Sequence, residues 1–131
     1  MKLGLTCISA VLLFLCQSSV VSAQQLEQPD MYEQIEIEAD KLQRILNLED
    51  WQVFYVDSTL KHDYPAMQAE AQKLMAAKVS NRDIYQMVQD KWMDQIDATY
   101  KRIFTPEQWA AYLKQGAAKA QKARDKRKAK N

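Results

Sequence analysis

Apolar side chains recur every three or four residues along most of this chain, which is the spacing of one face of an α-helix. Strand-like alternation is scarce, and only one Gly and three Pro follow residue 23, so residues that favour turns are few. The pattern predicts an all-α protein: a small bundle of about four helices with a long antiparallel helical hairpin.

Two amphipathic stripes define the first two helices. The first helix is expected over 31–46 and ends at Asn47, and the second stripe keeps its phase from Val53 to Leu74. Pro65 falls inside the second stripe, where a proline removes a backbone hydrogen bond and crowds the preceding turn. Because a full break would reset the phase, we expect one continuous helix over about residues 49–78, kinked at Pro65.

The third helix is expected to follow Ser80 as its N-cap and to run to about Ile103. Its apolar arc is wide, which indicates more than one neighbouring helix. We expect a second face to be solvated, with Lys101 as a helical ion-pair partner at its end. This acidic face carries Asp90, Asp94 and Asp97.

The run Phe104-Thr105-Pro106-Glu107-Gln108-Trp109 has every element of a helix N-terminus. Thr105 and Gln108 are spaced as a capping box, in which each side chain binds the backbone N–H of the other residue. Pro106 suits the first turn, where its missing N–H has no helical partner. A fourth helix is therefore expected to begin at this run.

Residues 46–52 form a looser copy of the same run, at the start of the second helix. Leu48 and Gln52 take the places of the Phe and the Gln of the closer copy. Glu49 stands at the Thr position and caps less well than Thr, and Asn47, with Asp50 three residues on, is the alternative cap.

The N-terminus has the composition of a secretion signal. An apolar stretch from Leu5 to Leu15 follows one Lys, and the residues before Gln24 suit cleavage. We assign 1–23 to a signal peptide and 24–113 to a helical domain. The apolar stretch is shorter than the ~20 residues that span a bilayer, so no transmembrane segment is expected after cleavage. The protein is expected to be exported, either to the periplasm or into the medium.

Charge divides the rest of the chain into an acidic body and a basic tail. Gln24 to Leu113 has nine Lys or Arg against sixteen Asp or Glu, a net charge of −7. The Ala/Lys-rich tail, 114–131, has eight against one, a net charge of +7. We expect a fraying, solvent-exposed helix there, because nothing large is left to bury.

The tail is either a solubilising segment or a contact for an anionic surface or an acidic protein. It lacks the interleaved aromatic residues that stack on bases, so nucleic acid is not an expected partner. The candidate electrostatic contacts are Lys122, Arg124, Lys126, Arg127 and Lys128.

Two motif copies behind a signal peptide in a short helical chain resemble the LTxxQ-motif family of periplasmic proteins, the Spy and CpxP group. The resemblance covers roughly residues 45–115. It implies a four-helix protein that often forms homodimers and acts as an ATP-independent chaperone, as an adaptor that damps a sensor kinase, or in metal stress. The motif is structural in this family and brings helix starts together. That role would fall here on Leu48, Gln52, Phe104, Thr105 and Gln108.

Exposed aromatic residues often concentrate binding energy in protein interfaces. Trp51, Tyr55 and His62 lie on one stripe of the second helix, opposite its apolar stripe, and Trp92 of the third helix is a further candidate. We interpret these residues as a surface for a partner or for dimerisation. The alternative is that the first or the fourth helix covers the stripe.

Catalytic and metal-binding patterns are missing from the sequence. Both cysteines, Cys7 and Cys16, lie in the signal, so the mature chain has neither a disulfide nor a thiolate. His62 is the one histidine, and no nucleophile or further ligand stands at a catalytic or zinc-binding spacing. We expect no enzyme, no catalytic residue, no metal and no cofactor.

The expected function is protein binding. The leading hypothesis is an ATP-independent periplasmic chaperone or envelope-stress protein that acts on unfolded or stress-exposed proteins. One alternative is a regulatory adaptor of an envelope-stress sensor. Another is a structural envelope protein tethered by its basic tail.

Overall fold

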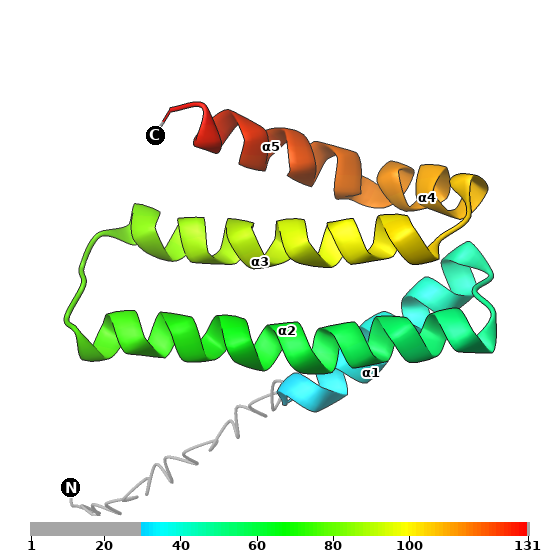
Figure 1. Ribbon diagram of the computed structural model, residues 1–131, viewed down its shortest axis with the longest axis horizontal. Helices are drawn as coiled ribbons and strands as arrows, with labels where there is room; N and C mark the ends of the chain where they lie inside the picture. Colours follow the sequence, from blue (N-terminus) through cyan, green and yellow to red (C-terminus); the bar gives the residue numbers. More distant parts are fainter. Residues whose placement is uncertain (1–29, 131) are drawn as a thin grey trace, which may run out of the picture.

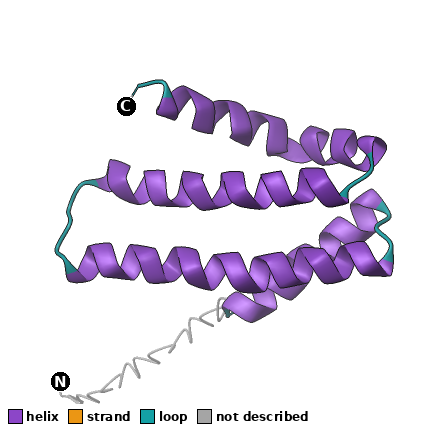
Figure 2. Cartoon of the chain, in the orientation of Figure 1, coloured by secondary structure: helices purple, strands orange, loops and turns teal. Residues whose placement is uncertain are grey.

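The computed structural model describes residues 30–130, which form helices joined by short turns (Figure 1, Figure 2). This part of the chain contains no strand, so the predicted all-α class is confirmed. The signal peptide predicted over 1–23 lies outside the described residues. In chain order the elements are α1 (Met31–Leu46), α2 (Asp50–Ala76), α3 (Arg82–Ile103), α4 (Pro106–Tyr112), the π-helical turn η1 (Leu113–Ala117) and α5 (Ala118–Lys128).

The helices are arranged around the long hairpin of α2 and α3, which run antiparallel (Figure 1). The last helix, α5, lies along the side of α3 that faces away from α2. At the end of the hairpin where α3 stops, α4 turns the chain back and α1 crosses α2 obliquely. One end of the molecule is therefore built from four helices.

The boundaries of α1 and α2 follow from their end residues. Asp30 accepts a hydrogen bond from the backbone N–H of Glu33 (2.9 Å) and so caps α1. The alternative that Asn47 caps α2 is wrong, because Asn47 adopts a left-handed conformation (φ 50°) that ends α1, and Glu49 is the N-cap of α2. As predicted, α2 continues through Pro65; the kink there stays a prediction.

The starts of α3 and α4 rest on side-chain caps. The N-cap of α3 is Asn81, whose side chain accepts from the backbone N–H of Asp83 (2.9 Å), so the prediction of Ser80 is wrong by one residue. Asn caps as well as Ser, which is why sequence alone did not separate them. The capping box of Thr105 and Gln108 is confirmed, with N–H···O distances of 3.2 and 2.9 Å.

The apolar core lies at the four-helix end. Its least exposed apolar side chains, at 1% or less, are Ile35, Leu60, Val56 and Ile96. Beside them Phe104 stacks on Tyr100 with ring centroids 5.1 Å apart, and Tyr112 lies edge-on to both rings. Such ring pairs contribute roughly 0.5–1.5 kcal/mol each beyond their buried area. This end is therefore the rigid part of the molecule.

The C-terminal segment contradicts the prediction of a fraying, exposed tail. Residues 118–128 form the ordered helix α5, and its one buried side chain is that of Arg124. The chain turns toward α3 at Gly116, whose φ of 114° is favourable for glycine and strained for other residues. The prediction failed because it required large apolar side chains for docking, whereas α5 is held by charged ones.

Candidate functional site

Three aromatic side chains lie exposed and in mutual contact on the first turns of α2. Trp51, Phe54 and Tyr55 are 50%, 66% and 51% exposed. The Trp51 and Tyr55 rings meet edge-on with centroids 6.2 Å apart, and the Phe54 and Tyr55 rings do so at 5.8 Å. We call these three residues the aromatic patch. A contiguous exposed apolar surface of this kind is typical of protein-binding sites.

The patch lies where it does because of the helical period. In this part of α2, Gln52, Val56 and Leu60 are turned into the protein and are at most 1% exposed. The aromatic side chains between these positions must then point outward. Trp51 is also oriented locally, since its Nε1 donates a hydrogen bond to the Glu49 carboxylate at 2.6 Å.

Two paired amides, the buried Gln52 and the half-buried Gln108, hold the helix that carries the patch. Gln52 Nε2 donates to Gln108 Oε1 (2.6 Å), and Gln108 Nε2 donates back to Gln52 Oε1 (3.1 Å). Gln52 Nε2 also donates to the backbone carbonyl of Ile103 (2.9 Å). We call this contact the glutamine joint. It connects the first turn of α2 to the first turn of α4.

The joint is symmetric in its local chemistry. Gln52 Oε1 accepts from the backbone N–H of Glu49, and Gln108 Oε1 accepts from that of Thr105, each at 2.9 Å. Each amide therefore caps its own helix and binds the other amide. Buried polar groups of this kind are stabilising only when all are paired, and in the described chain no buried side-chain nitrogen or oxygen lacks a partner.

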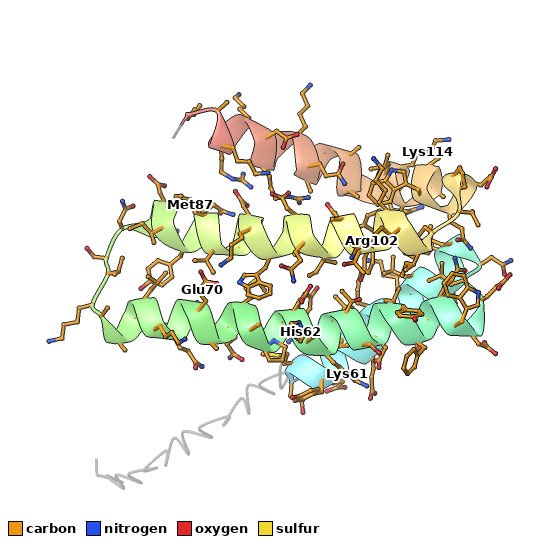
Figure 3. All side chains as sticks on the ribbon, viewed as in Figure 1. Lys61, His62, Glu70, Met87, Arg102 and Lys114 are labelled. Carbon is orange, nitrogen blue, oxygen red and sulfur yellow. The ribbon has the colours of Figure 1, made fainter. Side chains whose placement is uncertain are left out.

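Only some of the residues predicted to form a binding surface lie on the same side of the protein. Trp51 and Tyr55 are exposed, so the alternative that α1 or α4 covers them is wrong. His62 is exposed on the same side of α2 two turns further on, with Nδ1 2.7 Å from the Asp63 carboxylate. Trp92 lies elsewhere: it is half-buried on α3, and its Nε1 donates to Glu70 of α2 (2.8 Å). Figure 3 shows Glu70 on the side of α2 that faces α3.

Sequence reasoning missed Phe54, the most exposed member of the patch. A signal for it was present in the run from Trp51 to Val56. Because Gln52 and Val56 point inward, Phe54 lies about 60° from Trp51 around the helix axis and belongs to the same outer side. The missing information was that Gln52 points into the protein. Glutamine is usually a surface residue, so the sequence alone does not indicate this.

The acidic face of α3 also differs from its prediction as a solvated surface. Asp90 and Asp97 are each 6% exposed because α5 covers them. Arg127 binds Asp90 through two nitrogens at 2.6 and 2.7 Å, and Arg124 binds Asp94 at 2.7 Å and also Asp97. The predicted pairing of Asp97 with Lys101 is replaced by this contact with Arg124.

Further donors complete this acidic face. Tyr112 Oη donates to Asp97 (2.6 Å), Gln121 donates to the same carboxylate (3.0 Å), and Lys128 Nζ lies 2.5 Å from Asp94. We call the contacts of Asp90, Asp94 and Asp97 with the cations of α5 the ionic interface. Each of its carboxylates has at least one cationic partner.

The ionic interface lowers the pKa of two of its carboxylates, those of Asp90 and Asp94. Hydrogen bonds from Arg127 hold the pKa of Asp90 below its ordinary value, although burial opposes this. Burial alone would raise the pKa of Asp94, but its hydrogen bonds to Lys128 and Arg124 outweigh burial and lower that pKa. These carboxylates therefore stay ionised at neutral pH and act as anchors for α5.

The ionic interface changes the interpretation of the basic tail. Arg124, Arg127 and Lys128 are engaged within the chain and are not free contacts for a partner. Lys122 and Lys126 are exposed and have no ion pair within residues 30–130. The candidate electrostatic contacts therefore divide into an inward set and an outward set.

A second apolar surface adjoins the start of α1. Since α1 has 16 residues and α2 has 27, α1 covers only part of the α2–α3 hairpin. Next to the first turn of α1 an open groove of about 540 Å³ remains. Its apolar and aromatic lining includes Met31, Tyr64, Met67, Ala71, Tyr85 and Val88.

Other site classes find no support among the described residues. Within 30–130, no cluster of three or more His, Cys, Asp or Glu side chains is placed to hold a metal ion. No helix of this part has both the length and the apolar character needed to cross a bilayer. No family model, curated protein or solved structure matches the chain.

Proposed function

We propose that this protein is an exported, non-enzymatic protein-binding protein, an ATP-independent periplasmic chaperone or envelope-stress protein. The observation that carries the proposal is the aromatic patch, exposed on a helix that the glutamine joint fixes to the rigid end. Aromatic rings contribute large contact areas with few rotatable bonds, so they bind apolar segments at a small entropic cost.

The chemistry around the patch favours reversible capture. Glu49 and Asp50 are exposed beside Trp51, and Asp57, which pairs with Lys61 at 2.8 Å, lies one turn beyond Phe54. Apolar rings bordered by carboxylates favour unfolded segments that combine apolar and basic side chains. The groove next to α1 offers a second apolar contact for a longer segment of the same client.

The glutamine joint supports the proposal through the motif. The LTxxQ resemblance implies that Gln52 and Gln108 bring two helix starts together, and their amides lie 2.6 Å apart. The motif residues then belong to the scaffold and the binding surface lies elsewhere. This assignment agrees with a protein that binds other proteins and does no chemistry at the motif.

Two alternative functions, a regulatory adaptor and a structural envelope protein, make different predictions. A regulatory adaptor would bind one envelope sensor through the same patch, and would protect no general client. A structural envelope protein would be tethered through its basic segment. The ionic interface argues against a tether that uses all five predicted cations of the tail, because three of them are engaged with α3.

The experiment is an aggregation assay with the chain from Gln24, several unrelated thermally or chemically unfolded substrates, and no nucleotide. The proposal predicts suppression of aggregation for most substrates at near-stoichiometric ratios. Failure to protect any substrate, together with specific capture of one membrane sensor, would establish the adaptor instead.

A further inference from the structure

The outer edge of the layer formed by α4 and α5 is a row of free lysines. Lys119, Lys122 and Lys126 recur at intervals of three and four residues, so they share one side of α5. Lys114 points from the same outer edge, away from α3 (Figure 3). All four are exposed, and none has a carboxylate partner within residues 30–130. We call these four residues the lysine row.

The ionic interface holds this row in place. The inward side of α5 carries Arg124, Arg127 and Lys128, which bind the aspartates of α3. The helix is therefore fixed with its remaining cations outward. Asp125, the one carboxylate of α5, lies 3.8 Å from Lys128 and leaves the row unneutralised.

We infer that the lysine row is a docking surface for an anionic lipid bilayer. Between the lysines the exposed residues are alanines, Gln115, Gly116 and Asp125, so the edge lacks the large aromatic and aliphatic anchors of a protein interface. A bilayer with anionic headgroups needs no such anchors, because cations near its surface are attracted by about 1 kcal/mol each, roughly fivefold in affinity. Its phosphates also recur over an extended plane, which matches cations spread along the outer edge of a helix.

Nucleic acid fits this edge less well. Arginine is the side chain that binds phosphates and base edges with two parallel hydrogen bonds, and both arginines of α5 are turned toward α3. The edge also has no aromatic ring on which a base could stack. The inference goes beyond client capture, because the lysine row and the aromatic patch share no residue.

The length of the lysine row allows all of its charges to approach one flat surface. From Lys119 to Lys126 the helix rises about 10 Å, and Lys114 extends the edge beyond the turn at Gly116. All four charges can then lie within one Debye length, about 8–10 Å at physiological salt, of the same flat surface. Attachment is expected to be purely electrostatic and without insertion into the acyl region.

The test is co-sedimentation of the chain from Gln24 with vesicles. One set is pure phosphatidylcholine and the other contains phosphatidylglycerol. The wild type is expected to bind only the anionic vesicles and to be released by high salt. Replacing the four lysines of the row by Gln should weaken binding on the order of 100-fold or more. A matched control removes four exposed lysines elsewhere: Lys41, Lys73, Lys78 and Lys101.

The outcomes separate the inference from its competitors. Equal losses in the two variants would show that net charge alone attracts the protein, and would overturn the inference. Absence of wild-type binding to anionic vesicles would also overturn it, as would retention of a DNA duplex without vesicle binding. Free inorganic phosphate at constant ionic strength should not displace the protein, because a single phosphate cannot bridge the row.

Discussion

The two sides of α3 are held by different physics. Toward α1, α2 and α4 at the rigid end, the contacts are mainly apolar side chains, stacked rings and the glutamine joint, and the Lys91–Glu70 ion pair joins α3 to α2 further along the hairpin. Toward α5 they are the arginine and lysine pairs of the ionic interface, and α5 buries no apolar side chain. Apolar burial is largely indifferent to salt and pH, whereas ion pairs respond to both. The rigid end and the outer layer should therefore respond differently to the same change in solution.

This difference assigns each region a separate role. The rigid end presents the aromatic patch at a fixed orientation, and α5 covers the acidic face that would otherwise repel anionic partners. Well-packed apolar residues would stabilise the docked helix at least as well as buried ion pairs do. The chain instead uses its basic segment to neutralise its own acidic body.

The largest effect on the comparison is expected from Arg124→Ala. Arg124 is 4% exposed and bridges two aspartates, and removing one partner of a buried ion pair costs about 3 kcal/mol or more. Hydrogen exchange should then accelerate in α5 before α2. The exposed Lys122→Ala control should change stability by less than about 0.5 kcal/mol. If both variants behave alike, the ionic interface does not hold α5.

A change on the other side, Gln52→Leu, is expected to lower the free energy of unfolding by about 1–3 kcal/mol. It leaves the Gln108 amide and the Ile103 carbonyl without their partner at a buried position. Urea unfolding followed by circular dichroism measures this loss, which should not depend on salt. Gln72→Leu on the exposed side of α2 is the matched control. Equal stability of the two variants would contradict the role given to the joint.

A smaller effect is expected from Gly116→Ala, which strains the turn that directs α5 onto α3. An added Cβ meets no atom within 4 Å, so the cost comes from the backbone conformation, about 1–2 kcal/mol. Urea unfolding measures it. The Ala→Gly change at Ala123, in the middle of α5, should cost about 1 kcal/mol by a different route, loss of helix propensity. A stabilised Gly116→Ala protein would show that the turn is not as described.

Acid should loosen the ionic interface before the rigid end. Because the pKa values of Asp90 and Asp94 are lowered in the folded protein, their stabilising contribution is present above the ordinary Asp pKa of about 4 and is lost as pH falls below it. Glu70, whose pKa is lowered by Lys91 and Trp92, contributes in the same direction. Between pH 7 and pH 3, the free energy of unfolding of the wild type should fall more steeply than that of the Asp90→Asn variant. An equal slope in that variant would contradict the assignment.

The sequence was sufficient to predict those elements that a single local rule determines. The helical period predicted α1 and α2, and the Thr105–Gln108 box predicted the start of α4. It failed where the deciding contact was between distant segments. Nothing in the tail itself shows that Arg124 meets Asp97, since the two lie 27 residues apart and the contact needs the turn at Gly116.

The candidate site shows the same limit. Trp51 and Tyr55 could be selected from their stripe, but whether another helix covered them depended on where α1 and α4 lie. Phe54 was missed because its neighbour Gln52 looks like a surface residue until its partner Gln108 is known. Local pattern identifies side chains that are able to bind, and tertiary contacts decide which of them are free to do so.

The most direct test of the central claim is the affinity of a permanently unfolded, reduced and alkylated client for three proteins. They are the wild type, a patch variant with Trp51, Phe54 and Tyr55 changed to Ser, and a control with three dispersed residues of similar exposure changed to Ser: Tyr32, Met75 and Met87. Interface aromatic residues that matter contribute at least about 1–2 kcal/mol each, so the patch variant should bind at least about 10-fold more weakly. The control should bind within about twofold of the wild type. Equal affinity of the patch variant and the wild type would contradict the account.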